Sequence, residues 1–169
     1  SGSVAQKHLP TQVIADNVTT FIFVAAGKHH TCAIDEEKSL WCWGKNDRGQ
    51  CGVGTAGPSL ITPSRVSSLH SWQHIAAGKN ITCAIREGGS LFCWGAVLFN
   101  ETLPELVTNA EQPTLIDSNH IYEHITVGDG FIIALDSEGK RYGRGQNNYG
   151  QLGNDQTWVF EPQLIGIEE

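Results

Sequence analysis

The chain has 169 residues, which is enough for one domain with a substantial hydrophobic core. Its 18 acidic and 11 basic residues give a net charge of −7, which argues against nucleic acid or an anionic membrane surface as the main partner. No apolar run reaches the roughly 18 residues that a membrane span requires, so we expect no span in this segment. The 19 glycines separate short apolar runs, and this pattern favours an all-β array over a helical bundle.

One phrase recurs three times along the chain, at intervals of about fifty residues. Gly27, Gly78 and Gly128 mark its start, and a second set of glycines at positions 44, 95 and 145 keeps the same spacing. A fixed period of this length indicates one supersecondary unit copied in series. We therefore divide the chain into a probable cloning scar at 1–3, a leading strand or linker at 4–19, and repeats at 20–70, 71–120 and 121–169.

Each repeat contains two short apolar runs separated by three turn residues. A three-residue hairpin loop favours a left-handed conformation at its last position, which glycine adopts without steric cost. Gly89 and Gly139 fit that position, whereas Lys38 fits it less well. The pattern predicts a β-hairpin in every repeat.

Four of the five cysteines lie in the hairpins of the first two repeats. The expected register places Cys32 opposite Cys42 and Cys83 opposite Cys93. Directly opposed residues have Cβ atoms about 4.5–5.5 Å apart, so a small adjustment permits a disulfide. We expect two disulfides, and four separate buried thiols are the alternative.

The third repeat lacks both cysteines together, since Ile133 and Gly143 stand at the matching positions. This joint loss is what a functional pair would show. The fifth cysteine, Cys51, matches Leu152 of the third repeat, which predicts a buried free thiol rather than a reactive one. Cysteine spacings typical of zinc sites are absent from the sequence, so no metal site is expected.

The strings Ala26–Gly52 and Gly145–Gly153 resemble the repeat of the regulator of chromosome condensation family, and the resemblance covers about residues 20–166. It implies an all-β fold of three four-stranded propeller-type blades. Three blades are too few to close a ring, because closed propellers have about 4–8 blades. Pro10 also begins a further copy of the Pro-x-x-Val element that ends each repeat. We expect an incomplete propeller, or half of an assembled one.

The second repeat departs from the pattern after Gly95, where the Gly-Gln-x-Gly element is missing. The stretch 96–112 is expected to be irregular, and irregular segments on a rigid scaffold often bind a partner. The alternative is a diverged connection whose apolar side chains pack against the blade. The candidate contact residues are Val97, Leu98 and Phe99 in this stretch, with Tyr149 and Trp158 as aromatic anchors elsewhere.

Seven histidines invite a metal or catalytic interpretation. The pairs His70/His74 and His120/His124 recur at a spacing of fifty, but residues four apart on a strand are about 13 Å apart. Metal binding within a pair is therefore not expected. No nucleophile elbow, phosphate loop or H-E-x-x-H segment is present in the sequence, so we predict no enzyme and no cofactor.

Three glycosylation sequons start at Asn17, Asn80 and Asn100. Together with paired cysteines they favour an extracellular or secretory setting. The sequence therefore favours a non-catalytic protein–protein interaction module from a secreted or cell-surface β-propeller, such as a receptor ectodomain. Self-association or pairing with further repeats would cover the terminal blades. The alternatives are nucleotide exchange on a small GTPase with chromatin binding, which the resemblance implies, a secreted enzyme inhibitor, and a sugar-binding propeller.

Overall fold

The computed structural model describes residue 9 and residues 12–14, 20–99 and 107–165. In this part of the chain twelve strands form three antiparallel sheets of four strands, and neighbouring strands in each sheet are consecutive in sequence. The all-β class and the three four-stranded blades are confirmed. Pro10, which begins the fourth Pro-x-x-Val element, lies outside the described residues.

Each blade is one meander of four strands. The first blade consists of β1 (Phe21–Ala26), β2 (His30–Asp35), β3 (Leu40–Asn46) and β4 (Gly57–Arg65). The second blade consists of β5 (Trp72–Ala77), β6 (Ile81–Arg86), β7 (Leu91–Phe99) and β8 (Val107–Asp117). The third blade consists of β9 (Tyr122–Val127), β10 (Phe131–Asp136), β11 (Arg141–Gln146) and β12 (Trp158–Ile165).

The central hairpin of every blade has the predicted three-residue turn. Gly89 and Gly139 have φ angles of 84° and 81°, and Lys38 has φ 63° at the same position of the first blade. Lys38 thus adopts the left-handed conformation that its side chain disfavours, because the flanking strands fix the turn. The hairpins are confirmed in all three repeats.

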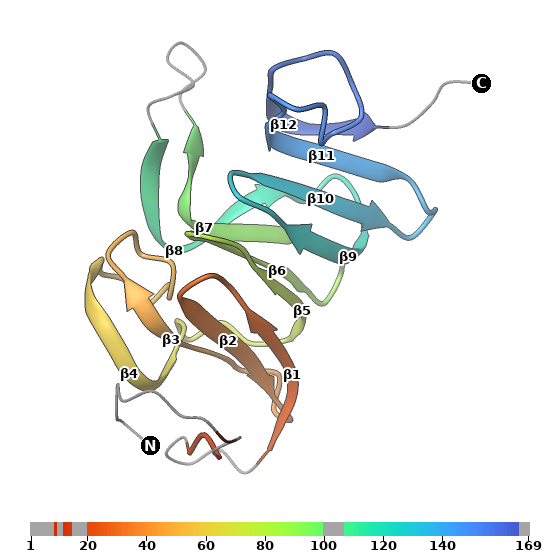
Figure 1. Cartoon of the computed structure of the whole chain (residues 1–169). Coiled ribbons are helices and arrows are strands. Elements are labelled where there is room, and N and C mark those ends of the chain that lie inside the picture. The colour runs from red at the N-terminus through yellow and green to blue at the C-terminus, as the bar shows by residue number, and fades with distance from the viewer. Residues whose placement is uncertain (1–8, 10–11, 15–19, 100–106, 166–169) are drawn as a thin grey trace.

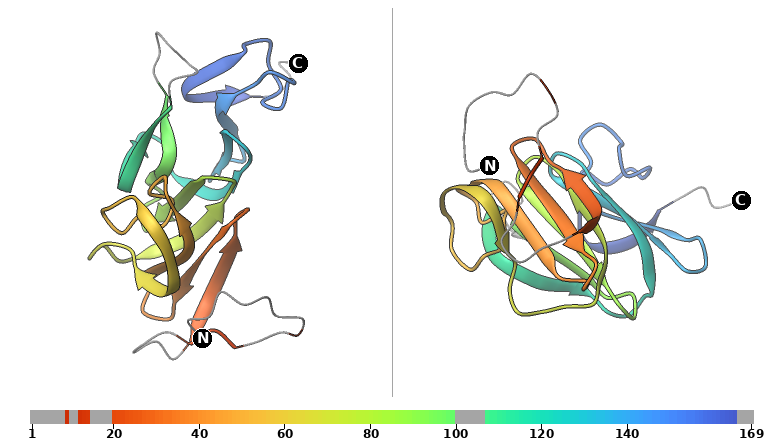
Figure 2. Two further views of the ribbon diagram at one scale, coloured as in Figure 1. Left: turned by 60° about the vertical axis from the view of Figure 1, so that its left-hand side comes forward. Right: turned by 90° about the horizontal axis from the view of Figure 1, so that it is seen from below.

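The blades follow one another in a row, with the second blade between the first and the third (Figures 1 and 2). The first strands of successive blades are neighbours: β1 lies beside β5 where the first and second blades meet, and β5 lies beside β9 where the second and third blades meet. The core is shared between blades, since residues of the first and second blades belong to one buried cluster that reaches Ile125 and Ile132 of the third. Blade stacking, rather than any single sheet, therefore buries the apolar side chains.

The glycines that open the first two repeats lie where the backbones of successive blades are in contact. A Cβ atom on Gly27 would overlap the carbonyl oxygen of Gly78, and one on Gly78 would overlap that of Gly128. The Lys28 amide also donates to the Gly78 carbonyl at 3.0 Å. The fifty-residue period of glycine is thus a requirement of backbone contact between neighbouring blades.

Candidate interaction surfaces

The hairpin cysteines pair as the sequence predicts. Cys32 faces Cys42 in the β2–β3 register and Cys83 faces Cys93 in the β6–β7 register. The sulfur atoms are 2.04 Å apart in the first pair and 2.16 Å apart in the second, which is disulfide distance. All four residues are buried, so both pairs belong to the core.

The third blade fills the space of a disulfide with larger neighbours. Ile133 faces Gly143, and a Cβ atom on Gly143 would lie 3.1 Å from the Leu152 side chain and 3.2 Å from that of Ile165. Leu152 and Ile165 therefore cover the glycine at the place where the first blade has its cystine. This packing explains why both cysteines are replaced together.

Cys51 is unpaired and buried. Burial raises the pKa of its thiol to about 12. Its sulfur lies 3.5 Å from the Lys45 carbonyl oxygen. A thiol with so high a pKa is a poor nucleophile at neutral pH, so Cys51 is suited to a packing role.

The first junction, between the first and second blades, is built around the carbonyl oxygen of Gln50. The Thr82 hydroxyl donates to this oxygen at 2.7 Å, and the Trp94 indole Nε1 donates to it at 3.0 Å. Thr82 and Trp94 are directly opposed partners in the β6–β7 register, and all three residues are fully buried. Gln50 comes from the Gly49–Gly52 turn of the first blade, so this turn supplies the acceptor and the second blade supplies both donors.

His30 of the first blade joins this network. Its Nε2 lies 2.7 Å from the Thr82 hydroxyl oxygen. Because the hydroxyl proton is directed to Gln50, His30 donates from Nε2 and its Nδ1 is the unprotonated nitrogen. Burial, and next the charge of His29, lower the pKa of His30 to about 4, so the ring is neutral at physiological pH.

The second junction, between the second and third blades, has a different chemistry on both sides. The second blade has no Gly-Gln-x-Gly turn to offer an acceptor. In the third blade Ile132 and Arg144 are the opposed pair that matches Thr82 and Trp94. The Arg144 Nε donates to the Phe160 carbonyl of its own blade. The threonine–tryptophan pair and the Gly-Gln-x-Gly turn are therefore both replaced at the second junction.

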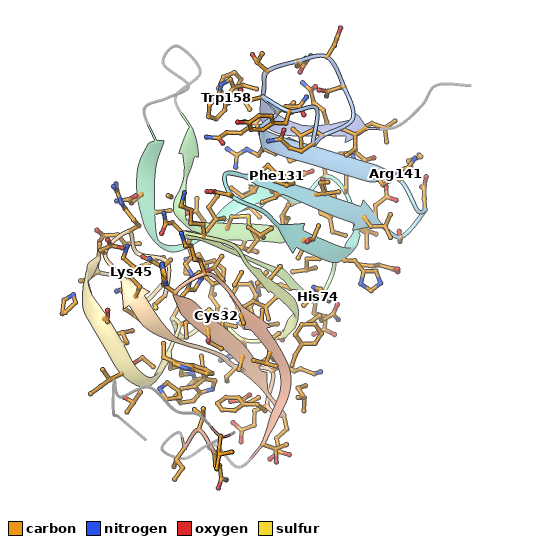
Figure 3. All side chains as sticks on the ribbon, viewed as in Figure 1. Cys32, Lys45, His74, Phe131, Arg141 and Trp158 are labelled. Atoms are coloured by element: carbon orange, nitrogen blue, oxygen red, sulfur yellow. A yellow bond between two sulfur atoms is a disulfide. The ribbon has the colours of Figure 1, made fainter. Side chains whose placement is uncertain are left out.

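Histidines from neighbouring blades meet at the second junction. The ring centroids of His74 on β5 and His124 on β9 are 5.3 Å apart, and that of Phe23 on β1 is 4.7 Å from that of His74, which Figure 3 labels. Burial, and next the charge of His124, lower the pKa of His74. His74 and His124, which occupy the same position of adjacent blades, are thus in contact. Their spacing of fifty residues alone did not establish this contact.

His120 is held in a separate polar cluster. Its Nδ1 and the Tyr122 hydroxyl each lie 2.7 Å from the same oxygen of Asp117. Burial alone would raise the pKa of Asp117, but hydrogen bonds from the Asn119 amide, His120 and Tyr122 outweigh it and lower the pKa. In the described part of the chain no group of three or more His, Cys, Asp or Glu residues is arranged to hold a metal ion.

The expected irregular stretch 96–112 is wrong for the residues that the structure describes. β7 continues to Phe99 and β8 begins at Val107, so both strands are longer than their counterparts in the first and third blades. Figure 1 shows this strand pair extending beyond the body of the second blade. The run Val97-Leu98-Phe99 has high β-propensity, and the glycine turn found in the other two repeats is missing from this one.

The base of this β7–β8 extension contacts the first blade. The Gly54 amide donates to the Glu111 carbonyl at 2.9 Å, and a Cβ atom on Gly49 would lie 2.9 Å from the Glu111 Cα. Val97, Leu98 and Phe99 lie on β7 within this extension. They remain predicted partner contacts.

The other candidate positions are dispersed over the molecule. Tyr149 is 95% exposed, and Trp158 begins β12. Asn80 lies just before β6, and the hydroxyl of its sequon residue Thr82 is committed to Gln50. Asn17 and Asn100 lie outside the described residues. No helix long and apolar enough to cross a membrane occurs in the described ranges.

Two models of the regulator of chromosome condensation (RCC1) repeat match the sequence, at residues 21–50 and 38–85. The chain contains RCC1 repeats. The backbone contacts of Gly27 and Gly78 with the next blade explain why the repeat keeps a glycine at this position.

Curated relatives contain similar RCC1-like segments. The human probable E3 ubiquitin-protein ligase HERC6 is 30% identical over 167 residues, covering 92% of this chain and 16% of HERC6. The Xenopus laevis RCC2 homolog is 30% identical over 143 residues, covering 82% of this chain and 28% of the homolog. The Arabidopsis thaliana ultraviolet-B receptor UVR8 is 29% identical over 156 residues, covering 90% of this chain and 35% of UVR8. The chain thus spans between 16% and 35% of these relatives.

Solved structures share the fold. Human WBSCR16 superposes with a TM-score of 0.76 at 19% identity, covering 90% of this chain and 39% of that structure. Prp20p from Saccharomyces cerevisiae superposes with a TM-score of 0.75 at 23% identity, covering 87% of this chain and 38% of that structure. The RCC1-repeat chain is therefore a partial propeller.

Sequence reasoning missed the residues that join the blades. Thr82, Trp94 and Gln50 carry the first junction, yet each resembles an ordinary repeat residue. A signal was present, because the copy without the Gly-Gln-x-Gly turn is followed by the copy in which Ile132 and Arg144 replace threonine and tryptophan. A comparison of the turn of one RCC1 repeat with the threonine and tryptophan positions of the next repeat would have indicated that these residues are in contact.

Proposed function

We propose that this chain is a non-catalytic protein-binding segment of an RCC1-type β-propeller that works in an oxidising setting, secreted or at a cell surface. The observation that carries the proposal is the pair of cystine positions. Each of the first two RCC1 repeats places two cysteines in facing positions at disulfide distance, and the third repeat lacks both cysteines. Disulfides of this kind persist in oxidising compartments.

Protein binding is supported by the solved relatives. Yeast RCC1 (Prp20) has been solved bound to Kap60, at a TM-score of 0.74 with this chain. This chain matches only 16% of HERC6, so the ligase activity in the name of that protein is no part of the proposal. We propose binding of a protein partner, with the exposed Tyr149, the half-buried Trp158 and the β7–β8 extension as the contact candidates.

The compartment is tested by mass spectrometry of the chain produced through a secretory pathway, alkylated with and without reduction. We expect two disulfides and one free thiol at Cys51. Five free thiols in the folded, secreted protein would overturn the oxidising assignment. Glycan occupancy at Asn17, Asn80 and Asn100 is measured on the same material.

The binding role is tested by affinity capture from extracellular fluid with three immobilised forms of the chain. These are the unaltered chain, the double variant Tyr149→Ala/Trp158→Ala, and a control, Leu115→Ser, which changes an exposed apolar residue of β8. We expect a protein that the unaltered chain and the control enrich equally and that the double variant loses. Equal recovery on all three would remove Tyr149 and Trp158 from the binding surface.

A further inference from the structure

Two histidine rings meet where the second and third blades are in contact. His74 and His124 each lie four residues before the recurrent glycine of their repeat, on the neighbouring strands β5 and β9 (Figure 1). Phe23 takes the same position in the first blade, so His74 meets phenylalanine at the first junction and histidine at the second. The histidine pair lies between two blades of the chain, and it does not depend on the outer faces of the first and third blades.

The two histidine rings are in edge-to-face contact. Their centroids are 5.3 Å apart and their planes are inclined by 88°. Aromatic rings in this arrangement attract each other while they are neutral. Two imidazolium rings at the same distance repel each other, because each carries a full positive charge.

The buried nitrogen of His74 adds a second cost to protonation. His74 Nδ1 is buried, and no described residue supplies a hydrogen-bond partner for it. An imidazolium carries a proton on both ring nitrogens, so its Nδ1–H is a buried donor without an acceptor. Burial, and next the charge of His124, lower the pKa of His74.

The strands packed against the pair supply no described carboxylate to balance a charge on it. β1 contains no ionisable residue. On β2, His30 contacts the threonine of the first junction and Asp35 accepts hydrogen bonds from its own hairpin. On β9, Tyr122 donates to the carboxylate of the preceding loop. The residues directly opposite the two histidines are apolar, namely Ile85 on β6 and Leu135 on β10.

The remaining charged groups of these strands have other partners or lie in solvent. Arg86 on β6 donates to a backbone carbonyl of the loop before β5, and Asp136 on β10 accepts from amides of its turn. Glu123 on β9 is exposed, where water and salt screen its charge. Lys79 and Asp129 form an exposed ion pair five residues further along the two chain segments, about 15 Å away and beyond the Debye length of about 8 Å.

We propose that the His74–His124 pair makes the second junction pH-sensitive, so that the second and third blades separate more readily in mildly acidic solution than at neutral pH. Protonation replaces an attractive ring contact by charge repulsion and leaves a buried donor unpaired. Separation at this junction breaks none of the Gln50 hydrogen bonds that hold the first junction. The pH response requires neither the proposed compartment nor a partner, so either proposal can fail without the other.

The direction of the effect follows from the two states of His74. Its pKa is lowered in the closed junction and returns to about 6.5 when the junction opens. The open form therefore binds more protons, so the closed form has its full stability above about pH 6.5 and loses stability as the pH falls. At about pH 5.5, one histidine that protonates only in the open form raises the open population by at most about tenfold.

The test is hydrogen exchange at two matched amides, at about pH 7.5 and about pH 5.5, with the intrinsic exchange rate at each pH divided out. The Tyr122 amide donates to the Gly89 carbonyl at 3.0 Å across the second junction. The Trp72 amide, at the same position of the second blade, donates to the Lys38 carbonyl at 3.1 Å across the first junction. Each amide therefore reports the opening of one junction.

Three forms of the chain are compared. They are the unaltered chain, His74→Phe, which copies Phe23, and the control His70→Gln, which changes an exposed histidine of the loop before β5. We expect acid to lower the protection of the Tyr122 amide severalfold in the unaltered chain and the control, but not in His74→Phe. The change at the Trp72 amide should be the same in all three forms. An equal loss at Tyr122 with and without His74 would overturn the proposal.

A second variant tests the charge coupling and does not depend on how His74→Phe folds. His124→Gln removes the neighbouring charge and should raise the pKa of His74, which NMR titration of the ring protons measures. An unmoved pKa of His74 would show that the two rings do not interact, and would contradict the proposal. Loss of protection that His74→Phe abolishes equally at both amides would contradict it too, because the histidines would then act on the whole fold.

Discussion

The two junctions of this molecule join the same kind of blade by different means. In the first junction the Gln50 carbonyl accepts hydrogen bonds from Thr82 and Trp94. In the second junction the acceptor turn is missing from one blade, and Ile132 and Arg144 replace the two donors on the other. The threonine–tryptophan pair and the Gly-Gln-x-Gly turn therefore behave as the two halves of one contact, and neither is needed to fold a blade by itself.

The largest expected effect on stability comes from Trp94, which lies inside the first junction. Trp43, its counterpart in the first blade, lies outside that junction. Trp94→Ala removes a fully buried indole and should lower the free energy of unfolding by about 3–5 kcal/mol. Trp43→Ala, at the same position of the first blade, should lower it less, because this side chain is only half-buried, beside Phe21 of its own blade. Urea unfolding of dilute protein measures both values. Similar losses for the two variants would show that tryptophan stabilises the blade itself.

The first junction should also be sensitive to acid through His30. The pKa of His30 is about 4 in the folded protein and about 6.5 in an unfolded chain, so the unfolded state binds more protons between these values. Stability is then complete above pH 6.5 and falls as the pH drops towards 4, by on the order of 3 kcal/mol. His30→Ile copies Ile81 at the same position of the second blade, and it should flatten this part of the pH profile. An unchanged profile would place the acid sensitivity elsewhere, for example at His74.

The cystines separate the first two blades from the third. Each closes a short loop with a sequence separation of 10, so removal of one pair by a double alanine substitution should cost about 2–3 kcal/mol. Denaturant unfolding of Cys32→Ala/Cys42→Ala and of Cys83→Ala/Cys93→Ala measures the two separately. Unfolding of the unaltered chain with and without a reductant is the control. Variants as stable as the parent would show that the facing thiols contribute by packing and not by a bond.

A smaller effect is expected from the hydroxyl of the first junction. Thr82→Val keeps the shape of the side chain but removes the donor to Gln50 and the acceptor for His30, which should cost about 1–2 kcal/mol. Thr31→Val, its counterpart on the outer face, should change stability by less than about 0.5 kcal/mol. Thermal unfolding of the two variants side by side provides the comparison. A loss at Thr31 equal to that at Thr82 would contradict a junction-specific role.

Much of the fold follows from local patterns in the sequence. The glycine period located the blades, and the three-residue turns ending at Gly89 and Gly139 set the register that brings the cysteines face to face. Lys38 shows the limit of the local rule, since it adopts a positive φ without being glycine. Strand pairing between adjacent runs depends on neighbours in sequence, and for that reason it was predictable.

The contacts between blades could not be predicted in the same way. The meeting of His74 and His124 depends on the rotation from one blade to the next, which no local pattern contains. The extension of β7 to Phe99 was mistaken for an irregular segment because the loss of a turn motif was taken as a loss of strand. The positions of the disulfides were therefore accessible from sequence, whereas the Gln50 network required the arrangement of the sheets.

The most direct test of the paired contact compares Gly52→Ala with Gly153→Ala, in dilute monomeric protein. The two glycines occupy the same position of the turn and have φ angles of 71° and 73°, so alanine introduces the same backbone strain at each. At Gly52 the new methyl group also meets the Trp94 indole at 2.6 Å, whereas at Gly153 it meets nothing within 4 Å. We predict that Gly52→Ala lowers the free energy of unfolding by about 1–3 kcal/mol more than Gly153→Ala does. Equal losses at the two glycines would contradict the account.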